Sequence, residues 1–211
     1  MMRNPYGPNF RLGYHGIILG IPGSGKSWLA KALTKDCKRV VYFDPHGDYE
    51  DLRGAEIVNP FDNERLIAAL RPGKPVRVVI PAERSDEREV KDEFEWLVKF
   101  LKWYKQGVVL VADEVGDYKV ECNKTLLRLH RNGHKFGIVT LLVSQRGVDI
   151  PLGCRATPTQ VYSLLQTHED DIEALEEMTR HLEGPPIEMV TAWKPPDKPL
   201  IWKRRELWGG R

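Results

Sequence analysis

Gly20-Ile21-Pro22-Gly23-Ser24-Gly25-Lys26-Ser27 follows the apolar run Gly16-Ile17-Ile18-Leu19 and leads into a helical pattern over residues 27–35. The stretch fits G-x-x-x-x-G-K-S/T, and the order strand, loop, helix is the context that this phosphate-binding pattern requires. Its glycines let the backbone turn several N–H groups inward, so that the loop and the first helical turn surround phosphate oxygens. The alternative is a glycine-rich turn that contains Lys-Ser by chance, which leaves the flanking strand and helix unexplained.

Two side chains of this loop carry its chemistry. Lys26 places a positive charge against the β- and γ-phosphate oxygens, and Ser27 offers a hydroxyl to Mg²⁺. We therefore predict a nucleoside triphosphate and Mg²⁺ as cofactors, with Ser27 as a metal ligand. The predicted nucleotide-binding residues are Gly20, Pro22, Gly23, Ser24, Gly25, Lys26, Ser27 and Trp28.

Composition describes an ordinary globular chain of 211 residues, 41% hydrophobic and 29% charged, which suits one domain. The net charge of +2 is too small to indicate a polyanionic partner by itself. Three separated cysteines without a C-x-x-C pattern predict reduced thiols and no structural metal. Neither a membrane span nor the apolar core of a signal peptide is visible, so we expect a cytoplasmic protein.

Apolar runs alternate with helical patterns along the chain, which predicts an α/β fold with a doubly wound, mostly parallel sheet. Strands are expected at 14–20, 39–43, 56–59, 76–80, 108–112, 138–143 and 158–165, and helices at 27–35, 63–70, 85–106, 122–131 and 168–181. Two closing runs, 187–193 and 200–202, predict a short C-terminal antiparallel edge hairpin. We expect an irregular lead-in over 1–13, a P-loop domain over 14–202 and a basic tail over 203–211.

The longest expected helix begins at Ser85, a favourable N-cap residue followed by acids. One apolar face of this helix should cover the sheet. A second aromatic stripe, formed by Trp96, Phe100 and Trp103, lies on another face. This stripe is either additional core or a contact between subunits, because interfaces are rich in large aromatic residues.

Two acids, Asp113 and Glu114, end the apolar run 108–112. A buried parallel strand delivers such residues to the edge of the sheet where ligands bind. The functional interpretation gives Asp113 the Mg²⁺ shell and makes Glu114 the catalytic group that polarises the attacking water. The alternative is a strand that ends in two solvated acids.

Four segments in this order resemble one family. They are Tyr14–Gly20 with the phosphate loop, Phe43-Asp44-Pro45-His46-Gly47-Asp48-Tyr49, the strand that ends in Asp113-Glu114, and Thr140-Leu141-Leu142-Val143-Ser144-Gln145-Arg146. Together they resemble the HerA/FtsK superfamily of P-loop ATPases. That group includes DNA translocases, conjugative coupling ATPases and the genome-packaging ATPases of tailless, membrane-containing viruses. The resemblance covers roughly residues 14 to 182.

The resemblance implies ATP bound between the subunits of a ring, usually a hexamer, with a RecA-like core. It makes Gln145 a catalytic residue that senses the γ-phosphate, and it places Asp44 and Asp48 near the site, as ligands of water or metal or as caps of a turn. A ring ATPase also needs a cation from the neighbouring subunit. Arg131 is the first choice for this catalytic role and Arg128 and Arg146 are the reserves, since His134 departs from the family's arginine pattern.

A chain of this length looks most like a viral genome-packaging ATPase, a DNA-translocating motor whose partners are double-stranded DNA and a portal or capsid/membrane protein. Expected DNA contacts are Lys119, Lys124, Arg155 and the basic tail, although solvated surface is the alternative for each. A phage morphogenesis or protein-extrusion ATPase is the alternative within the superfamily. A small-molecule P-loop kinase and a non-catalytic nucleotide switch are alternatives from other classes.

Overall fold

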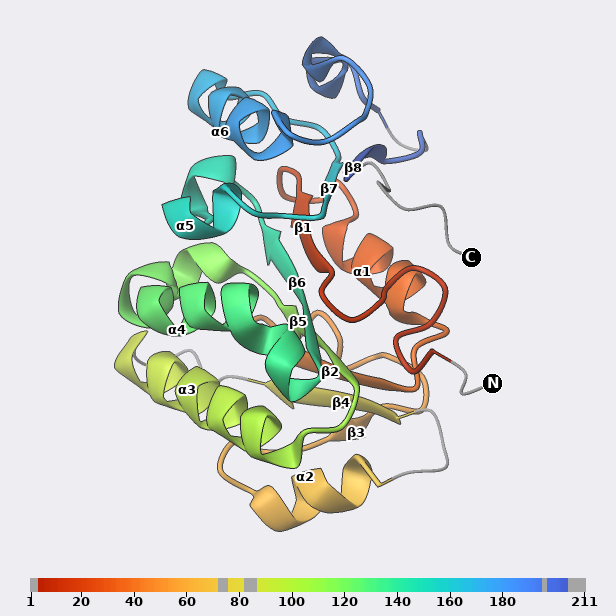
Figure 1. The fold of residues 1–211 in the computed structure, drawn as a ribbon, viewed down its shortest axis with the longest axis vertical. Helices are drawn as coiled ribbons and strands as arrows, with labels where there is room; N and C mark the ends of the chain where they lie inside the picture. Colours follow the sequence, from red (N-terminus) through yellow and green to blue (C-terminus); the bar gives the residue numbers. More distant parts are fainter. Residues whose placement is uncertain (1–3, 72–75, 82–86, 195–196, 205–211) are drawn as a thin grey trace.

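The computed structural model describes residues 4–71, 76–81, 87–194 and 197–204 (Figure 1). Eight strands form one sheet in the order β3-β4-β2-β5-β6-β1-β7-β8. Their bounds are β1 (His15–Leu19), β2 (Arg39–Asp44), β3 (Glu56–Ile57), β4 (Val76–Pro81), β5 (Val108–Ala112), β6 (Ile138–Ser144), β7 (Gln160–Ser163) and β8 (Leu200–Lys203). All neighbouring pairs are parallel except β7 and β8. The predicted α/β fold with a mostly parallel sheet is therefore confirmed.

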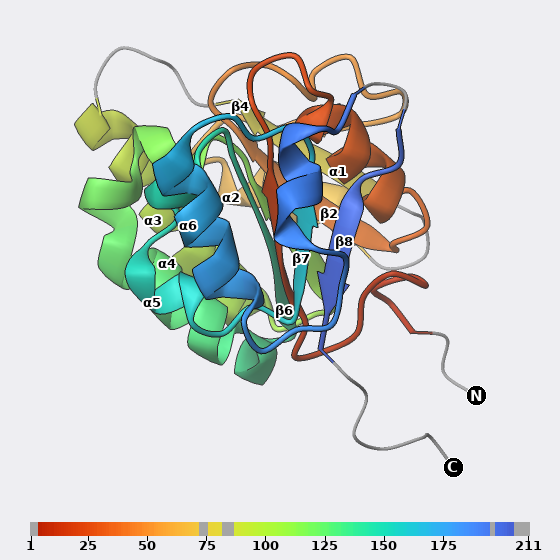
Figure 2. The same ribbon diagram turned by 90° about the horizontal axis from the view of Figure 1, so that it is seen from above.

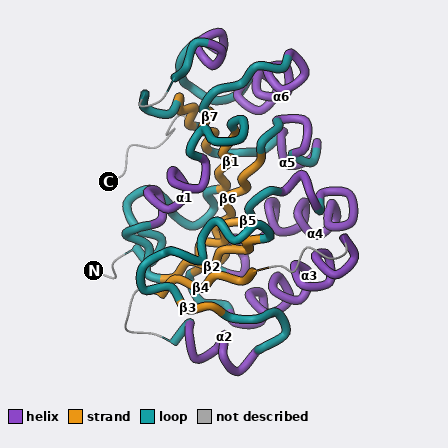
Figure 3. Tube along the Cα trace, turned by 180° about the vertical axis from the view of Figure 1, so that it is seen from behind, coloured by secondary structure: helices purple, strands orange, loops and turns teal. Residues whose placement is uncertain are grey.

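Helices cover both faces of the sheet. Their bounds are α1 (Lys26–Thr34), α2 (Asn63–Ala69), α3 (Glu87–Tyr104), α4 (Lys119–Asn132), α5 (Leu152–Arg155) and α6 (Glu169–Thr179). Figures 1, 2 and 3 show α3, α4, α5 and α6 side by side along one face, and α1 on the opposite face. This two-sided cover explains why the central strands are apolar throughout instead of alternating with polar residues.

Successive residues of each central strand enter different cores, because side chains alternate across a sheet. In β1, Ile17 packs with the residues beneath α3 and α4, whereas Ile18 packs with Leu29 of α1 on the other side. The described part of the lead-in joins the α1 side, where Tyr6 is buried. The lead-in is therefore packed onto the domain from residue 4 to residue 13.

The antiparallel pair at the C-terminal edge differs from the predicted hairpin. β8 pairs antiparallel with β7, with Val161 opposite Trp202. The run predicted as its partner strand instead forms a 3-10 helix over Ile187–Thr191. Val190 of this helix packs against the core. The apolar run therefore indicated correctly that the segment is partly buried, but the predicted strand was wrong. The short helix α5 was also not predicted.

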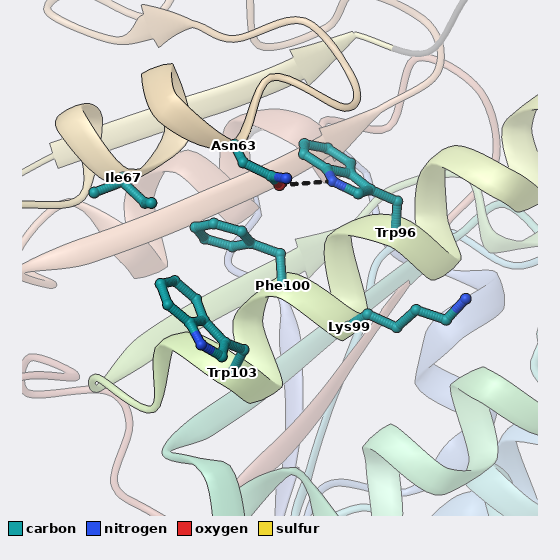
Figure 4. Close-up of a pocket in the computed structure, with 6 residues that line it drawn as sticks. All are labelled: Asn63, Ile67, Trp96, Lys99, Phe100 and Trp103. Carbon is teal, nitrogen blue, oxygen red and sulfur yellow. Dashed lines mark hydrogen bonds between the residues drawn. The ribbon is translucent and has the colours of Figure 1, made fainter.

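The aromatic stripe on α3 divides into buried and exposed members. Phe100 is buried, Trp96 is half-buried and Trp103 is 66% exposed. Figure 4 shows the three rings around a shallow hollow that Asn63 and Ile67 of α2 close on the other side. Trp96 Nε1 donates a hydrogen bond to Asn63 Oδ1 at 2.9 Å. Part of the stripe thus holds α3 against α2, and Trp103 lies on the surface.

Some sequence expectations fall on residues outside the described part. These are the Ser85 cap, the tail beyond residue 204, and the side chains of Lys119 and Cys122. Cys37 and Cys154 are buried, free thiols. Within the described ranges, no helix has both the length and the apolar character that crossing a membrane requires.

Candidate nucleotide-binding site

The phosphate loop connects the carboxyl end of β1 to the first residue of α1. Gly23 and Gly25 have φ angles of +73° and +97°, a region that glycine occupies without strain. A Cβ on Gly20 would lie 2.5 Å from Ser24 Oγ and 2.9 Å from Leu164 Cβ. Gly20 therefore lets the loop fold tightly against the segment that follows β7.

A pocket of about 480 Å³ opens above this loop. Six of the predicted nucleotide-binding residues line it: Pro22, Gly23, Gly25, Lys26, Ser27 and Trp28. Gly20 supports the loop from below, and Ser24 faces an adjoining cleft. The same pocket receives Glu114, Gln145, His46 and Asp48 from three other loops. It therefore collects side chains from the carboxyl ends of β1, β2, β5 and β6, which are contiguous in the sheet.

Lys26, Glu114 and Gln145 meet inside the pocket. Lys26 Nζ lies 3.8 Å from Glu114 Oε1, and their side chains are only 7% and 10% exposed. Gln145 Nε2 donates a hydrogen bond to the same oxygen at 3.0 Å. Three residues predicted as catalytic from separate strands are thus brought into one contact group.

Asp113 lies beneath the pocket and does not line it. The residue is 1% exposed, and its Oδ1 accepts the backbone N–H of Glu114 at 3.0 Å. Burial raises the pKa of Asp113 to about 7, and the nearby charge of Glu114 adds to the rise. Asp113 holds the backbone that carries Glu114.

The turn after β2 brings a different carboxylate to Ser27. Asp44 is fully buried, and its two oxygens accept the N–H groups of Asp48 and Tyr49, each at 2.9 Å. Asp44 therefore caps the turn, one of the two roles expected for it. Ser27 Oγ donates a hydrogen bond to Asp48 Oδ2 at 2.8 Å. The sequence reasoning paired Ser27 with Asp113, whereas the structure places Asp48 beside it.

His46 is a pocket residue that sequence reasoning did not single out. It comes from the same turn, and its Nε2 lies 2.5 Å from Asp117 Oδ2. The signal available in the sequence was its position between Asp44 and Asp48, at the end of a buried strand. The contact joins the loops after β2 and β5 across the mouth of the pocket.

Arg131 and Arg128 lie away from this chain's own pocket, whereas Arg146, the third candidate trans-acting arginine, directly follows the pocket residue Gln145. Arg131 is exposed in the last turn of α4, next to His130. The centre of the His130 ring lies 4.7 Å from that of His15 at the start of β1, with the two rings tilted. That end of the sheet is opposite the phosphate loop. Arg128 is exposed on the same helix. Arg146 is held by Asp171, with its Nε 3.2 Å from Asp171 Oδ2.

Among the proposed DNA contacts, Arg155 has an internal role. Its Nε donates to the carbonyl of Ile150 and its Nη2 to the carbonyl of Val148, each at 2.8 Å. Nη1 also lies 3.4 Å from Glu177. These contacts fix the segment between β6 and α6. Lys124 remains exposed on α4.

Comparison with known proteins by sequence gives a match to a family model. Residues 11–99 match the family model described as Helicase HerA, central domain, a range that holds the phosphate loop and the Asp44–Tyr49 turn. This part of the chain is therefore similar to the central domain of HerA. A search of curated proteins by sequence found no match.

Solved structures share the fold of this chain at low sequence identity. The genome packaging NTPase B204 of Sulfolobus turreted icosahedral virus 2, in complex with AMPPCP, aligns with TM-score 0.62 and 16% identity over 87% of this chain and 89% of that one. VirB4 of Thermoanaerobacter pseudethanolicus aligns with TM-score 0.67 and 14% identity over 91% and 89%. The Type VII secretion ATPase EccC of Thermomonospora curvata gives 0.59 and 14% over 90% of this chain and 25% of that chain.

Proposed function

We propose that this chain is an ATP-hydrolysing motor that moves double-stranded DNA, acting as a ring in the packaging of a viral genome. The convergence of Lys26, Glu114 and Gln145 above the phosphate loop carries the proposal, because it combines a phosphate-binding cation, a carboxylate and an amide in one pocket. A water attacking the γ-phosphorus needs all three, since phosphoryl transfer depends on positioning and on neutralising charge.

In this proposal each side chain has one task. Glu114 accepts a hydrogen bond from the attacking water and aims its oxygen at the γ-phosphorus, as the bond to the β–γ bridging oxygen breaks. When nucleotide binds, the Lys26 ammonium group exchanges its contact with Glu114 for contacts with the phosphate oxygens. Glu114 is then free to bind the attacking water. Gln145 holds Oε1 of Glu114 by its hydrogen bond. In this proposal its side chain also responds to the γ-phosphate, and this changes the position of the loop after β6.

Mg²⁺ fits the oxygen donors of the pocket. Mg²⁺ is usually held by one or two protein groups together with phosphate oxygens and waters. Ser27 Oγ and Asp48 Oδ2 are two oxygen donors 2.8 Å apart at the phosphate loop, and they would hold it, with Asp113 as a carboxylate beneath them. When bound, the ion neutralises charge on the β- and γ-phosphate oxygens.

The proposal also names the cargo of the motor and the assembly in which it works. Similarity to a genome packaging NTPase over nearly the whole of both chains supports a role in genome packaging, and the proposed cargo is double-stranded DNA. The proposed assembly is a homo-oligomeric ring, a hexamer, that works with a portal or capsid/membrane protein. The similarity to a Type VII secretion ATPase favours a second candidate, a motor that moves protein substrates.

The test measures steady-state ATP hydrolysis with and without double-stranded DNA, over a range of protein and salt concentrations. We expect DNA to stimulate hydrolysis, the rate to rise more steeply than linearly with protein, and the stimulation to fade with salt. Lys26→Ala should abolish the activity, whereas Lys35→Ala, at the exposed end of α1, should not. Hydrolysis that ignores DNA and scales linearly with protein would overturn the DNA motor.

A further inference from the structure

A second cleft, of about 260 Å³, adjoins the phosphate pocket. The two cavities share Gly25 and Trp28 and therefore lie next to each other. Leu29 of α1 and, far from it in the sequence, Leu164, Trp193 and Pro199 supply the other apolar lining of the second cleft, and Asp197 also lines it. Except for Leu29, these residues belong to the β7 and β8 edge of the sheet, next to the strand that delivers the phosphate loop.

Trp28 stands at the junction of the two cavities. It is 71% exposed although it is a large aromatic residue, and it directly follows the Lys-Ser pair of the loop. Exposing an indole to water is unfavourable, so a flat apolar ligand that covers it would gain from burial and from ring stacking. A nucleobase has this shape and this chemistry.

The opposite wall is held in place by its own hydrogen bonds. Trp193 is buried, and its Nε1 donates to the carbonyl of Lys198 at 3.0 Å. Asp197 contacts Lys194 twice, donating its N–H to the carbonyl at 2.8 Å and accepting the Lys194 N–H on Oδ2 at 3.2 Å. These bonds hold Trp193 and Asp197, two residues that line the cleft.

We propose that this cleft holds the base of the nucleoside triphosphate and that Trp28 stacks on it. The inference rests on the phosphate site of the proposed function. It adds that this chain's affinity for nucleotide depends on an aromatic residue of α1 and on Trp193 and Pro199 at the opposite wall. The phosphates would lie over the loop while the base lies between Trp28 and Leu164.

The experiment separates base binding from phosphate binding by titration calorimetry with two probes, AMPPCP and inorganic tripolyphosphate. We expect the unmodified protein to bind AMPPCP more tightly than tripolyphosphate. Trp28→Ala should weaken AMPPCP binding about tenfold, the range of base–aromatic stacking, and leave tripolyphosphate binding unchanged. Trp28→Phe should keep most of the affinity. The matched control is Trp103→Ala, which removes another exposed tryptophan, on α3.

Each contrary outcome points to a different failure. Equal affinity for AMPPCP and tripolyphosphate in the unmodified protein would overturn the base cleft and leave the phosphate site standing. Equal losses for both probes in Trp28→Ala would also overturn it, because Trp28 would then support the loop. Failure of the unmodified protein to bind either probe would overturn the phosphate site, and the proposed function with it.

Discussion

Glu114 combines an unusual backbone with the central contact of the site. Its φ of +43° lies in the left-handed region, which costs a non-glycine residue of order 1 kcal/mol. The buried Asp113 accepts its N–H, and Lys26 and Gln145 both contact its Oε1. The surrounding structure therefore holds this carboxylate in one place above the loop.

Glu114→Gln tests the role of that carboxylate. We expect ATP hydrolysis to fall at least about a hundredfold, because an amide is a poor acceptor for the attacking water. AMPPCP binding should change little, since the phosphate loop stays intact. Glu50→Gln, an exposed residue near the turn after β2, is the control for both measurements. Unchanged turnover in Glu114→Gln would remove Glu114 from its proposed role.

Two buried histidines make stability depend on pH. Burial lowers the pKa of His15 to about 4, and the charges of His134 and Arg204 add to the fall. Burial lowers the pKa of His130 to about 3, and His15 and Arg131 add to that fall. Their folded-state pKa values lie below the ordinary value of 6.5. Protons therefore bind the unfolded chain first, and stability falls as pH drops below about 6.5 towards 4.

Removing one of these rings should weaken that dependence. From pH 7 to pH 5, each buried histidine costs about 2 kcal/mol of unfolding free energy. Between pH 7 and pH 5, the unfolding free energy of His130→Gln should fall by about 2 kcal/mol less than that of the unmodified protein. Urea unfolding at both pH values measures this difference. His168→Gln, at an exposed position, should retain the full loss. An unchanged pH dependence in His130→Gln would show that its ring does not titrate as a buried group.

At the scale of elements, helix α6 holds the loop that carries Gln145. Asp171 is buried in the first turn of α6; its Oδ2 contacts Arg146 Nε at 3.2 Å, and its Oδ1 accepts the Val148 N–H at 3.3 Å. A Cβ on Gly147 would lie 2.9 Å from the carbonyl oxygen of Asp171. The residues that follow Gln145 therefore rest directly on the helix.

Asp171→Asn should disturb Gln145 through this contact. We expect kcat to fall several-fold, because Gln145 would no longer be held against Glu114, whereas AMPPCP affinity should stay the same. Loss of the charge pair should also lower the unfolding free energy, because Asp171 is buried and accepts two hydrogen bonds. Asp170→Asn, an exposed neighbour in the same helical turn, is the control. A change in AMPPCP affinity with unchanged kcat would contradict the positioning role.

For the whole molecule, the proposed ring predicts a site shared between subunits. Arg131 is exposed at the end of the sheet that faces away from its own pocket. In a ring, such a residue can complete a neighbour's pocket and stabilise charge on the phosphoryl group in transfer. The pocket of an isolated chain would then lack this cation.

Mixing two inactive variants tests that sharing. We expect Lys26→Ala and Arg131→Ala each to lose hydrolysis, and an equimolar mixture to regain part of it, because a Lys26→Ala subunit still offers Arg131 to its neighbour. Lys26→Ala mixed with Glu114→Gln should regain nothing, since both defects lie in a subunit's own pocket. Full activity of Arg131→Ala alone would exclude Arg131 and turn attention to Arg128.

The sequence by itself determined the phosphate loop, the alternation of strands and helices, and the strand ends that carry Glu114 and Gln145. These features depend on local patterns, and parallel strands bring their carboxyl ends to one edge whatever the details of the loops. Lys26, Glu114 and Gln145 were therefore predictable as neighbours from three separate stretches of sequence.

Only the tertiary structure decided which groups lie within bonding distance. Asp48 reaches Ser27 because Asp44 caps the preceding turn, and Asp113 is buried because its strand ends beneath the pocket. β8 pairs with β7, and Trp193 faces Trp28 across a cleft, through long connections with no local signature. Such contacts depend on the paths of loops and on the choice among several possible packing partners. Neither is encoded in the periodicity of a single segment.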